Sequence, residues 1–112
     1  MNQKLKGAFN DEMNIAKKYY ATKQFTLCFK HLERAHILAQ KYVIPHTLSH
    51  WWMLKVGLTT ADKKEIAGQC TRIVASILFS RLWVPVGNTG GSNVSALKKM
   101  PIPDDLKTLL KD

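Results

Sequence analysis

The sequence predicts an all-α fold with four main helices in two antiparallel hairpins, followed by an extended C-terminal arm and a short terminal helix. Three observations predict it. Apolar residues recur three and four positions apart through most of residues 4–83, which is the spacing of an amphipathic helix. Short breaks at residues 21–24, 45 and 59–62 divide this pattern into four parts. Residues 84–105 lose the pattern and contain three glycines and three prolines, as an extended arm does.

The first predicted helix runs from about Lys4 to Ala21. Its apolar residues fall on one face: Leu5, Ala8, Phe9, Met13, Ala16 and Tyr20. The turn at residues 21–24 is short, so the second helix, which begins at Phe25, should return antiparallel to the first. The second helix carries an unusually broad apolar arc. We therefore expect it to be the central helix, covered on two sides by other helices.

The third helix is predicted from about His46 to Leu58, because Pro45 lacks an N–H and disfavours helical backbone at the residue before it. The fourth begins with Asp62 as N-cap and Glu65 three residues later, which is the capping-box pattern. It is expected to continue to about residue 83. Its apolar face comprises Ile66, Ala67, Cys70, Ile73, Val74, Ile77, Leu78 and Leu82.

The arm contains a glycine-rich segment, Gly87-Asn88-Thr89-Gly90-Gly91. It lacks the GxxxxGK[ST] pattern of a phosphate-binding loop and follows no strand, so turns are the favoured interpretation. Asp104 and Asp105, directly after Pro103, are well placed to begin a last short helix. We predict a single helical domain over residues 1–112, with a helical body at 1–83 and the arm and short helix at 84–112.

A cytoplasmic location is expected, since residues 1–11 contain no apolar signal segment and no apolar tract is long enough to cross a bilayer. Cys28 and Cys70 lie in apolar stripes and belong to no CxxC motif, which predicts buried free thiols. The formal net charge of +9 makes a nucleic-acid or membrane-surface binder an alternative function. The lysines are scattered along the whole chain, however, which favours a solvated basic surface over a nucleic-acid site.

All four histidines lie between residues 31 and 50. His46 and His50 are four positions apart and can chelate a transition-metal ion from one helix face. His36 is the first candidate for a third ligand from the preceding helix, with His31, Glu33 or Cys28 as alternatives. Zinc, nickel and copper suit imidazole ligands. Binding should weaken as the pH falls through about 6.5, where imidazole takes up a proton.

The same histidines could instead be buried side chains that each donate one hydrogen bond and brace the fold. The sequence contains no HExxH motif, and spacing alone assembles neither a nucleophile with a base nor a pair of acids. These patterns favour a non-enzymatic protein. Three tryptophans, Trp51, Trp52 and Trp83, exceed what a small four-helix core requires, so at least one should be partly exposed or buried in a homodimer.

Four motifs together resemble a family of small bacterial proteins known as a domain of unknown function: residues 31–38 (HLERAHIL), Pro45-His46 with His50-Trp51, residues 84–91 (VPVGNTGG) and residues 100–103 (MPIP). The resemblance implies that the histidines and the glycine-rich loop are family features, without assigning an activity. The first hairpin, residues 16–36, resembles a tetratricopeptide unit. That likeness implies tetratricopeptide-like helix packing and a protein-interaction adaptor as a further alternative.

Overall fold

The computed structural model describes residues 1–79, 87–94 and 98–111, with the side chain of Phe79 left out. These residues form helices and connecting segments, with no strand among them. The predicted all-α fold is therefore confirmed. The helices are α1 (Gln3–Ala21), α2 (Phe25–Ala39), α3 (Val43–Thr60), α4 (Lys63–Phe79) and α5 (Asp104–Leu110).

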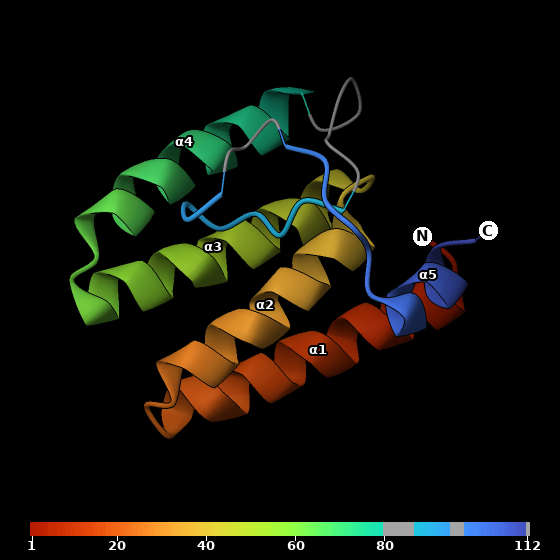
Figure 1. Ribbon diagram of the computed structural model, residues 1–112, viewed down its shortest axis with the longest axis horizontal. Coiled ribbons are helices and arrows are strands. Elements are labelled where there is room, and N and C mark those ends of the chain that lie inside the picture. Colours follow the sequence, from red (N-terminus) through yellow and green to blue (C-terminus); the bar gives the residue numbers. More distant parts are fainter. Residues whose placement is uncertain (80–86, 95–97, 112) are drawn as a thin grey trace.

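The two predicted hairpins are α1–α2 and α3–α4 (Figure 1). Helix α2 packs against α1 on one side and α3 on the other, and it also contacts α5, so it is the central helix. Residues 98–103 lead to α5, which lies beside the start of α1 (Figure 1). This arrangement places α2, α3, α4 and the glycine-rich loop close to one another.

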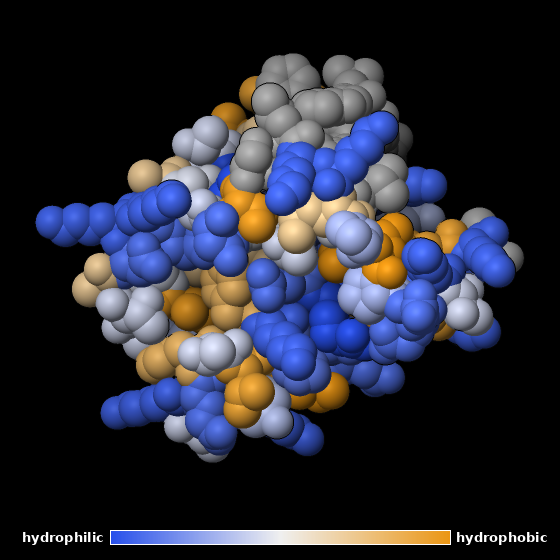
Figure 2. Space-filling view, viewed as in Figure 1, coloured by the Kyte–Doolittle hydropathy of each residue, from blue (hydrophilic) through white to orange (hydrophobic). Residues whose placement is uncertain are grey.

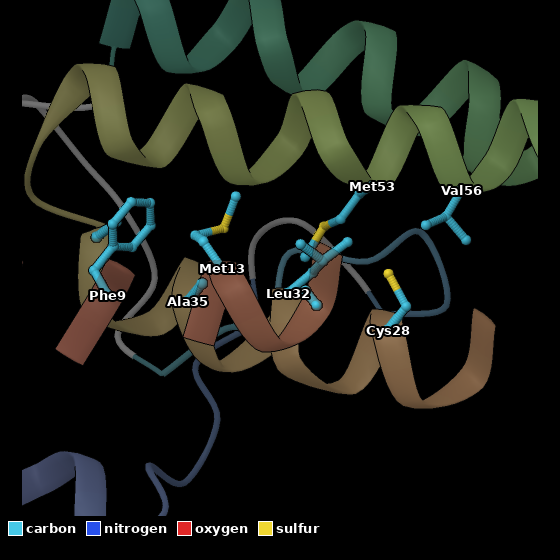
Figure 3. Close-up of a cluster of buried hydrophobic side chains, with 9 residues drawn as sticks. Phe9, Met13, Cys28, Leu32, Ala35, Met53 and Val56 are labelled. Atoms are coloured by element: carbon cyan, nitrogen blue, oxygen red, sulfur yellow. The ribbon is translucent and has the colours of Figure 1, made fainter. Parts of the chain in front are cut away.

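The main apolar core lies where α1, α2 and α3 meet. Leu32 of α2 and Met53 of α3 point towards each other in its centre, and both are fully buried (Figure 3). Phe9 and Met13 close the core from α1. A second cluster around Leu106 anchors α5 against α1 and α2. The face seen in Figure 2 is largely hydrophilic, with small apolar areas between polar ones.

Helix α3 begins at Val43, three residues before the predicted start. The prediction treated Pro45 as a boundary, but Pro45 lies within the first turn. The first N–H groups of a helix have no intrahelical acceptor, so a proline there loses no hydrogen bond. His46 N–H donates to the carbonyl of Tyr42 at 2.9 Å, which closes that turn.

The start of α4 is as predicted, with the Glu65 N–H donating to Asp62 Oδ1 at 3.1 Å. The reciprocal half of the capping box is absent. Glu65 Oε2 instead accepts a hydrogen bond from the N–H of Ser92 at 2.7 Å. Glu65 therefore ties the loop at residues 87–94 to the first turn of α4.

The apolar stripe of α4 does not face the other helices. Its buried positions are polar, namely Glu65, Gln69 and Ser76, while Val74 and Ile77 are exposed. Cys70 is also exposed, so the prediction of a buried thiol is wrong for Cys70. The prediction of a buried thiol is confirmed for Cys28, and burial raises the pKa of this thiol to about 11. The predicted end of this helix, including Leu82 and Trp83, lies outside the described residues.

Among the described residues, no helix combines the length and the apolar character that a membrane crossing needs.

Candidate metal centre

Three imidazole rings meet between α2, α3 and α4, and their Nε2 atoms form a nearly equilateral triangle. His36 Nε2 lies 2.9 Å from His46 Nε2 and 3.1 Å from His50 Nε2. His46 Nε2 and His50 Nε2 are 3.1 Å apart. All three side chains are buried. We call these three residues the histidine triad.

The helices place the triad by simple geometry. His46 and His50 lie one turn apart on the same face of α3, so their rings are neighbours. His36 reaches them from the facing side of α2, near its C-terminal end. Gly90 packs against the ring of His36 so closely that an added Cβ would lie 2.7 Å from Nε2 and 2.5 Å from Cδ2. Only glycine can approach the triad this way, and Gly90 also has a positive φ of 86°.

The outward nitrogens of two triad members have fixed acceptors. His36 Nδ1 lies 2.8 Å from the carbonyl oxygen of Asn88, which can only accept, so Nδ1 carries the hydrogen. His50 Nδ1 lies 2.6 Å from Gln69 Oε1. The amide of Gln69 cannot be reversed without loss, because its Nε2 donates to the Gly90 carbonyl at 2.9 Å. His36 and His50 therefore both direct an unprotonated Nε2 lone pair at the centre of the triad.

His46 cannot satisfy this arrangement as a neutral side chain. If its hydrogen is on Nε2, it can donate to His36, but the lone pairs of His36 and His50 still face each other at 3.1 Å. If the hydrogen is on Nδ1, no hydrogen remains in the triangle. Nδ1 of His46 is buried and has no hydrogen-bond partner among the described residues. Either form leaves buried polar atoms unpaired, at a cost of roughly 1–3 kcal/mol each.

At neutral pH the three imidazoles stay unprotonated, so no additional proton pairs the lone pairs that face each other. Burial lowers the pKa of His46 to about 4. Burial and then the charge of His46 lower the pKa of His50 to about 3, although its bond to Gln69 opposes the shift. Burial also lowers the pKa of His36 well below its usual value, reinforced by the other two rings. Proton competition in the folded protein is thus expected near pH 4, below the 6.5 of a free imidazole.

A metal ion would satisfy all three lone pairs at once. With metal–nitrogen bonds of about 2.0–2.1 Å, ligand nitrogens lie about 2.9 Å apart on an octahedral face and about 3.3 Å apart in a tetrahedral site. The observed edges of 2.9–3.1 Å fall within this range. Three protein ligands would leave at least one coordination position open to a further ligand.

The loop at residues 87–94 supports the triad from outside. It supplies the Asn88 carbonyl to His36 and the Gly90 carbonyl to Gln69. Arg72 of α4 holds the far end of the loop, donating to Ser92 Oγ at 2.9 Å and to the carbonyl of Val94 at 2.9 Å. Hydrogen-bond acceptors that orient ligating histidines are a regular feature of metal sites.

Gln69, Asn88 and Gly90 also belong to this site, although no sequence motif assigns them to it. A signal for Gln69 was present, since it follows Glu65 by four residues and so shares its face of α4. The Asn88 and Gly90 carbonyls are backbone groups, so the side-chain types in the sequence do not predict their role. The sequence predicts that the glycines form turns, and Gly87 and Gly90 do have positive φ angles.

The structure does not bring His31 to the triad. Its Nδ1 lies 2.7 Å from Glu12 Oε2 of α1, and its ring stacks on Tyr19. Arg34 binds the other oxygen of Glu12 at 2.8 Å and also pairs with Asp105 of α5. His31 therefore belongs to a polar network that joins α1, α2 and α5.

The two other alternative ligands are also elsewhere. Cys28 lies in the apolar core. Glu33 lines a surface pocket of about 380 Å³ together with Asp62 and Glu65. Burial, and to a lesser degree the charge of Glu65, raises the pKa of Glu33. Among the described residues, the triad is the group of potential ligands whose atoms lie close enough to share an ion.

Comparison with known proteins confirms the resemblance to a domain of unknown function. No curated protein and no solved structure matches the chain. A family model described as "Protein of unknown function (DUF3703)" matches residues 3–110, which include helices α1 to α5 and the whole triad. The chain therefore belongs to the DUF3703 family of proteins of unknown function.

Proposed function

We propose that this protein binds a transition-metal ion, with Nε2 of His36, His46 and His50 as the ligands. One observation carries the proposal: three buried nitrogens converge at 2.9–3.1 Å, and two of them hold lone pairs with no hydrogen between them. Neutral imidazole is the form that a metal ion needs, and burial keeps the triad neutral. Zinc, nickel and copper all suit an all-imidazole donor set.

Reversible binding fits the triad better than a permanent structural role. Structural zinc sites are closed by four protein ligands, whereas the triad supplies three. The three ligands also differ in the hydrogen bonds that their Nδ1 atoms make. His36 and His50 each have an outer acceptor, whereas Nδ1 of His46 has none among the described residues. We therefore propose that His46 is the ligand that most readily leaves the ion during exchange.

The competing interpretation is that the histidines only brace the fold. Thermal unfolding of untagged protein separates the two, because a polyhistidine tag would bind the same ions. The melting temperature of wild type, His50→Ala and His31→Ala would be measured with excess chelator and then with zinc, nickel or copper. His31→Ala is the matched control, since His31 lies in α2 outside the triad.

At a free-metal concentration one hundred times the dissociation constant, binding should add about 2.7 kcal/mol of stability. For a chain of this size that is a rise of about 10 °C in wild type and in His31→Ala. His50→Ala should gain far less. The proposal fails if metal raises the melting temperature of none of the three proteins, or raises all three equally.

A further inference from the structure

Glu65 is a buried carboxylate in the first turn of α4, and only 8% of the residue is exposed. Its Oε2 accepts hydrogen bonds from the N–H of Ser92 at 2.7 Å and from Gln69 Nε2 at 3.3 Å. Both of these donors are neutral. Among the described residues, no cationic side chain forms an ion pair with Glu65. Buried charges in proteins are normally paired with a cation or bind a metal ion, so the charge of Glu65 requires an explanation.

One amide connects Glu65 to the triad. The side chain of Gln69 is fully buried, and its Nε2 donates to Glu65 while its Oε1 lies 2.6 Å from His50 Nδ1. The negative charge of Glu65 polarises this amide, so its oxygen becomes a stronger acceptor and His50 a more basic ligand. Carboxylates commonly act on ligating histidines in metal sites, and here the carboxylate acts through an amide.

Glu33 adds a second negative charge near the triad. It lies three residues before His36 and therefore on the same face of α2. Glu33 and Glu65 both line the surface pocket of about 380 Å³, and Asp62 lines it as well. Among the described residues that line this pocket there is no lysine, arginine or histidine. The pocket therefore carries a local negative charge, although the chain has a net charge of +9.

Arg72 is the nearby charged group with the opposite effect. After burial and the neighbouring rings, the charge of Arg72 also lowers the pKa of His36 and of His50. It therefore disfavours a further positive charge at the triad. Its guanidinium donates to the loop at residues 87–94 and forms no ion pair with Glu65. Three neutral imidazoles supply no negative charge of their own, so a cation at the triad needs compensation from the neighbouring glutamates.

We propose a charge selectivity that depends on the proposed metal function: Glu65 and Glu33 favour divalent over monovalent cations at the triad. Glu65 also positions His50 through Gln69. The attraction between a fixed charge and a bound ion is proportional to the charge of the ion. Each glutamate therefore stabilises bound Zn²⁺ or Ni²⁺ by twice the free energy with which it stabilises bound Cu⁺. The factor that one glutamate contributes to the affinity for a divalent ion is thus the square of its factor for Cu⁺.

Glu65→Gln removes the charge and keeps the contacts, because its amide oxygen can accept both hydrogen bonds that Oε2 accepts. Dissociation constants for Zn²⁺, Ni²⁺ and, without oxygen, Cu⁺ would be measured by chelator competition in untagged protein. Parent and variants carry Cys70→Ser, since the exposed thiol of Cys70 would bind Cu⁺. We expect Glu65→Gln to weaken Zn²⁺ and Ni²⁺ binding on the order of 10–100-fold and Cu⁺ binding about 3–10-fold. Glu33→Gln should follow the same square relation with smaller factors.

Asp11→Asn is the matched control, because Asp11 is an exposed acid of α1 and its loss should change each affinity less than about twofold. Circular dichroism would verify folding, and Glu33→Gln keeps the test decisive if Glu65→Gln does not fold. Equal factors for the divalent ions and Cu⁺, as a purely structural role of Glu65 predicts, would overturn the inference. Unchanged affinities would overturn it too. A parent protein that binds none of the three ions would refute the metal site itself, and the inference with it.

Discussion

Acidification of the metal-free protein is expected to destabilise it between about pH 6.5 and pH 4. In an unfolded chain each imidazole has a pKa of about 6.5. In the folded protein the pKa is about 4 for His46 and about 3 for His50, and that of His36 is also well below 6.5. Over this range the unfolded state binds protons that the folded state does not. The stabilisation is therefore complete above pH 6.5 and is lost as the pH falls towards the folded-state values.

The size of the effect follows from the shifts. For each pH unit of acidification, each histidine that stays neutral in the folded state lowers the free energy of unfolding by up to about 1.4 kcal/mol. His46 alone accounts for about 3 kcal/mol between pH 6.5 and pH 4. His50 adds a similar amount over the same interval. A domain of this size has a free energy of unfolding of about 5–15 kcal/mol, so acidification from pH 6.5 to pH 4 should remove much of it.

Urea denaturation followed by circular dichroism, at pH values from 8 to 4.5 with chelator present, measures this loss directly. The double variant His46→Gln/His50→Gln should have a much flatter pH profile, because two of the titrating groups are gone. His31→Gln, which keeps the whole triad, should retain the steep profile. Equal stability of wild type at pH 7 and pH 5, or greater stability at pH 5, would refute the reasoning.

Further substitutions, with their controls, test the surroundings of the triad and the apolar core. Gln69→Leu removes the acceptor of His50 Nδ1 and should weaken metal binding about 10–100-fold in a chelator competition assay, whereas Gln24→Leu at an exposed position should not. Gly90→Ala should destabilise the metal-free protein by at least about 2 kcal/mol in urea, because its Cβ would lie 2.5 Å from the His36 ring. Gly7→Ala in α1, where nothing lies within 4 Å, should stabilise it by up to about 1 kcal/mol. Leu32→Ala at the centre of the core should cost about 2–5 kcal/mol in the same assay.

Most of the helical architecture could be predicted because apolar spacing and turn residues are local signals. Asp62 caps α4, and Asp104 opens α5, as the sequence indicates. Pro45 shows the limit of such signals. A proline is compatible with a helix boundary and with the first turn of a helix, and only the packing of α3 against its neighbours decides between them.

The orientation of α4 could not be predicted, because helical periodicity shows which residues share a face without showing what that face contacts. The sequence favours burial of the stripe through Cys70 and Val74. In the structure Glu65 and Gln69 face inwards because the loop and His50 need hydrogen-bond partners there. Those partners come from residues about 20 positions away or more, so no local pattern reveals them.

The sequence predicts His36, His46 and His50 as candidate ligands, but it does not show that the three converge. The spacing of His46 and His50 indicates a shared face, and the hairpin brings α2 opposite that face. Whether His31 or His36 meets them depends on the rotation of α2, which Glu12 helps to set by holding His31 and Arg34 against α1. The supporting acceptors depend on the backbone of the glycine-rich loop, whose path is a tertiary feature.

The most direct test of the metal centre is X-ray absorption spectroscopy of untagged protein loaded with one equivalent of zinc or nickel, with the metal content measured in parallel. We expect one ion per chain, with three imidazole nitrogens at about 2.0–2.1 Å. His36→Ala, His46→Ala and His50→Ala should each lose tight one-to-one binding, while His31→Ala should retain both the stoichiometry and the imidazole signal. A spectrum without imidazole scattering, or tight binding that survives all three substitutions in the triad, would contradict the assignment.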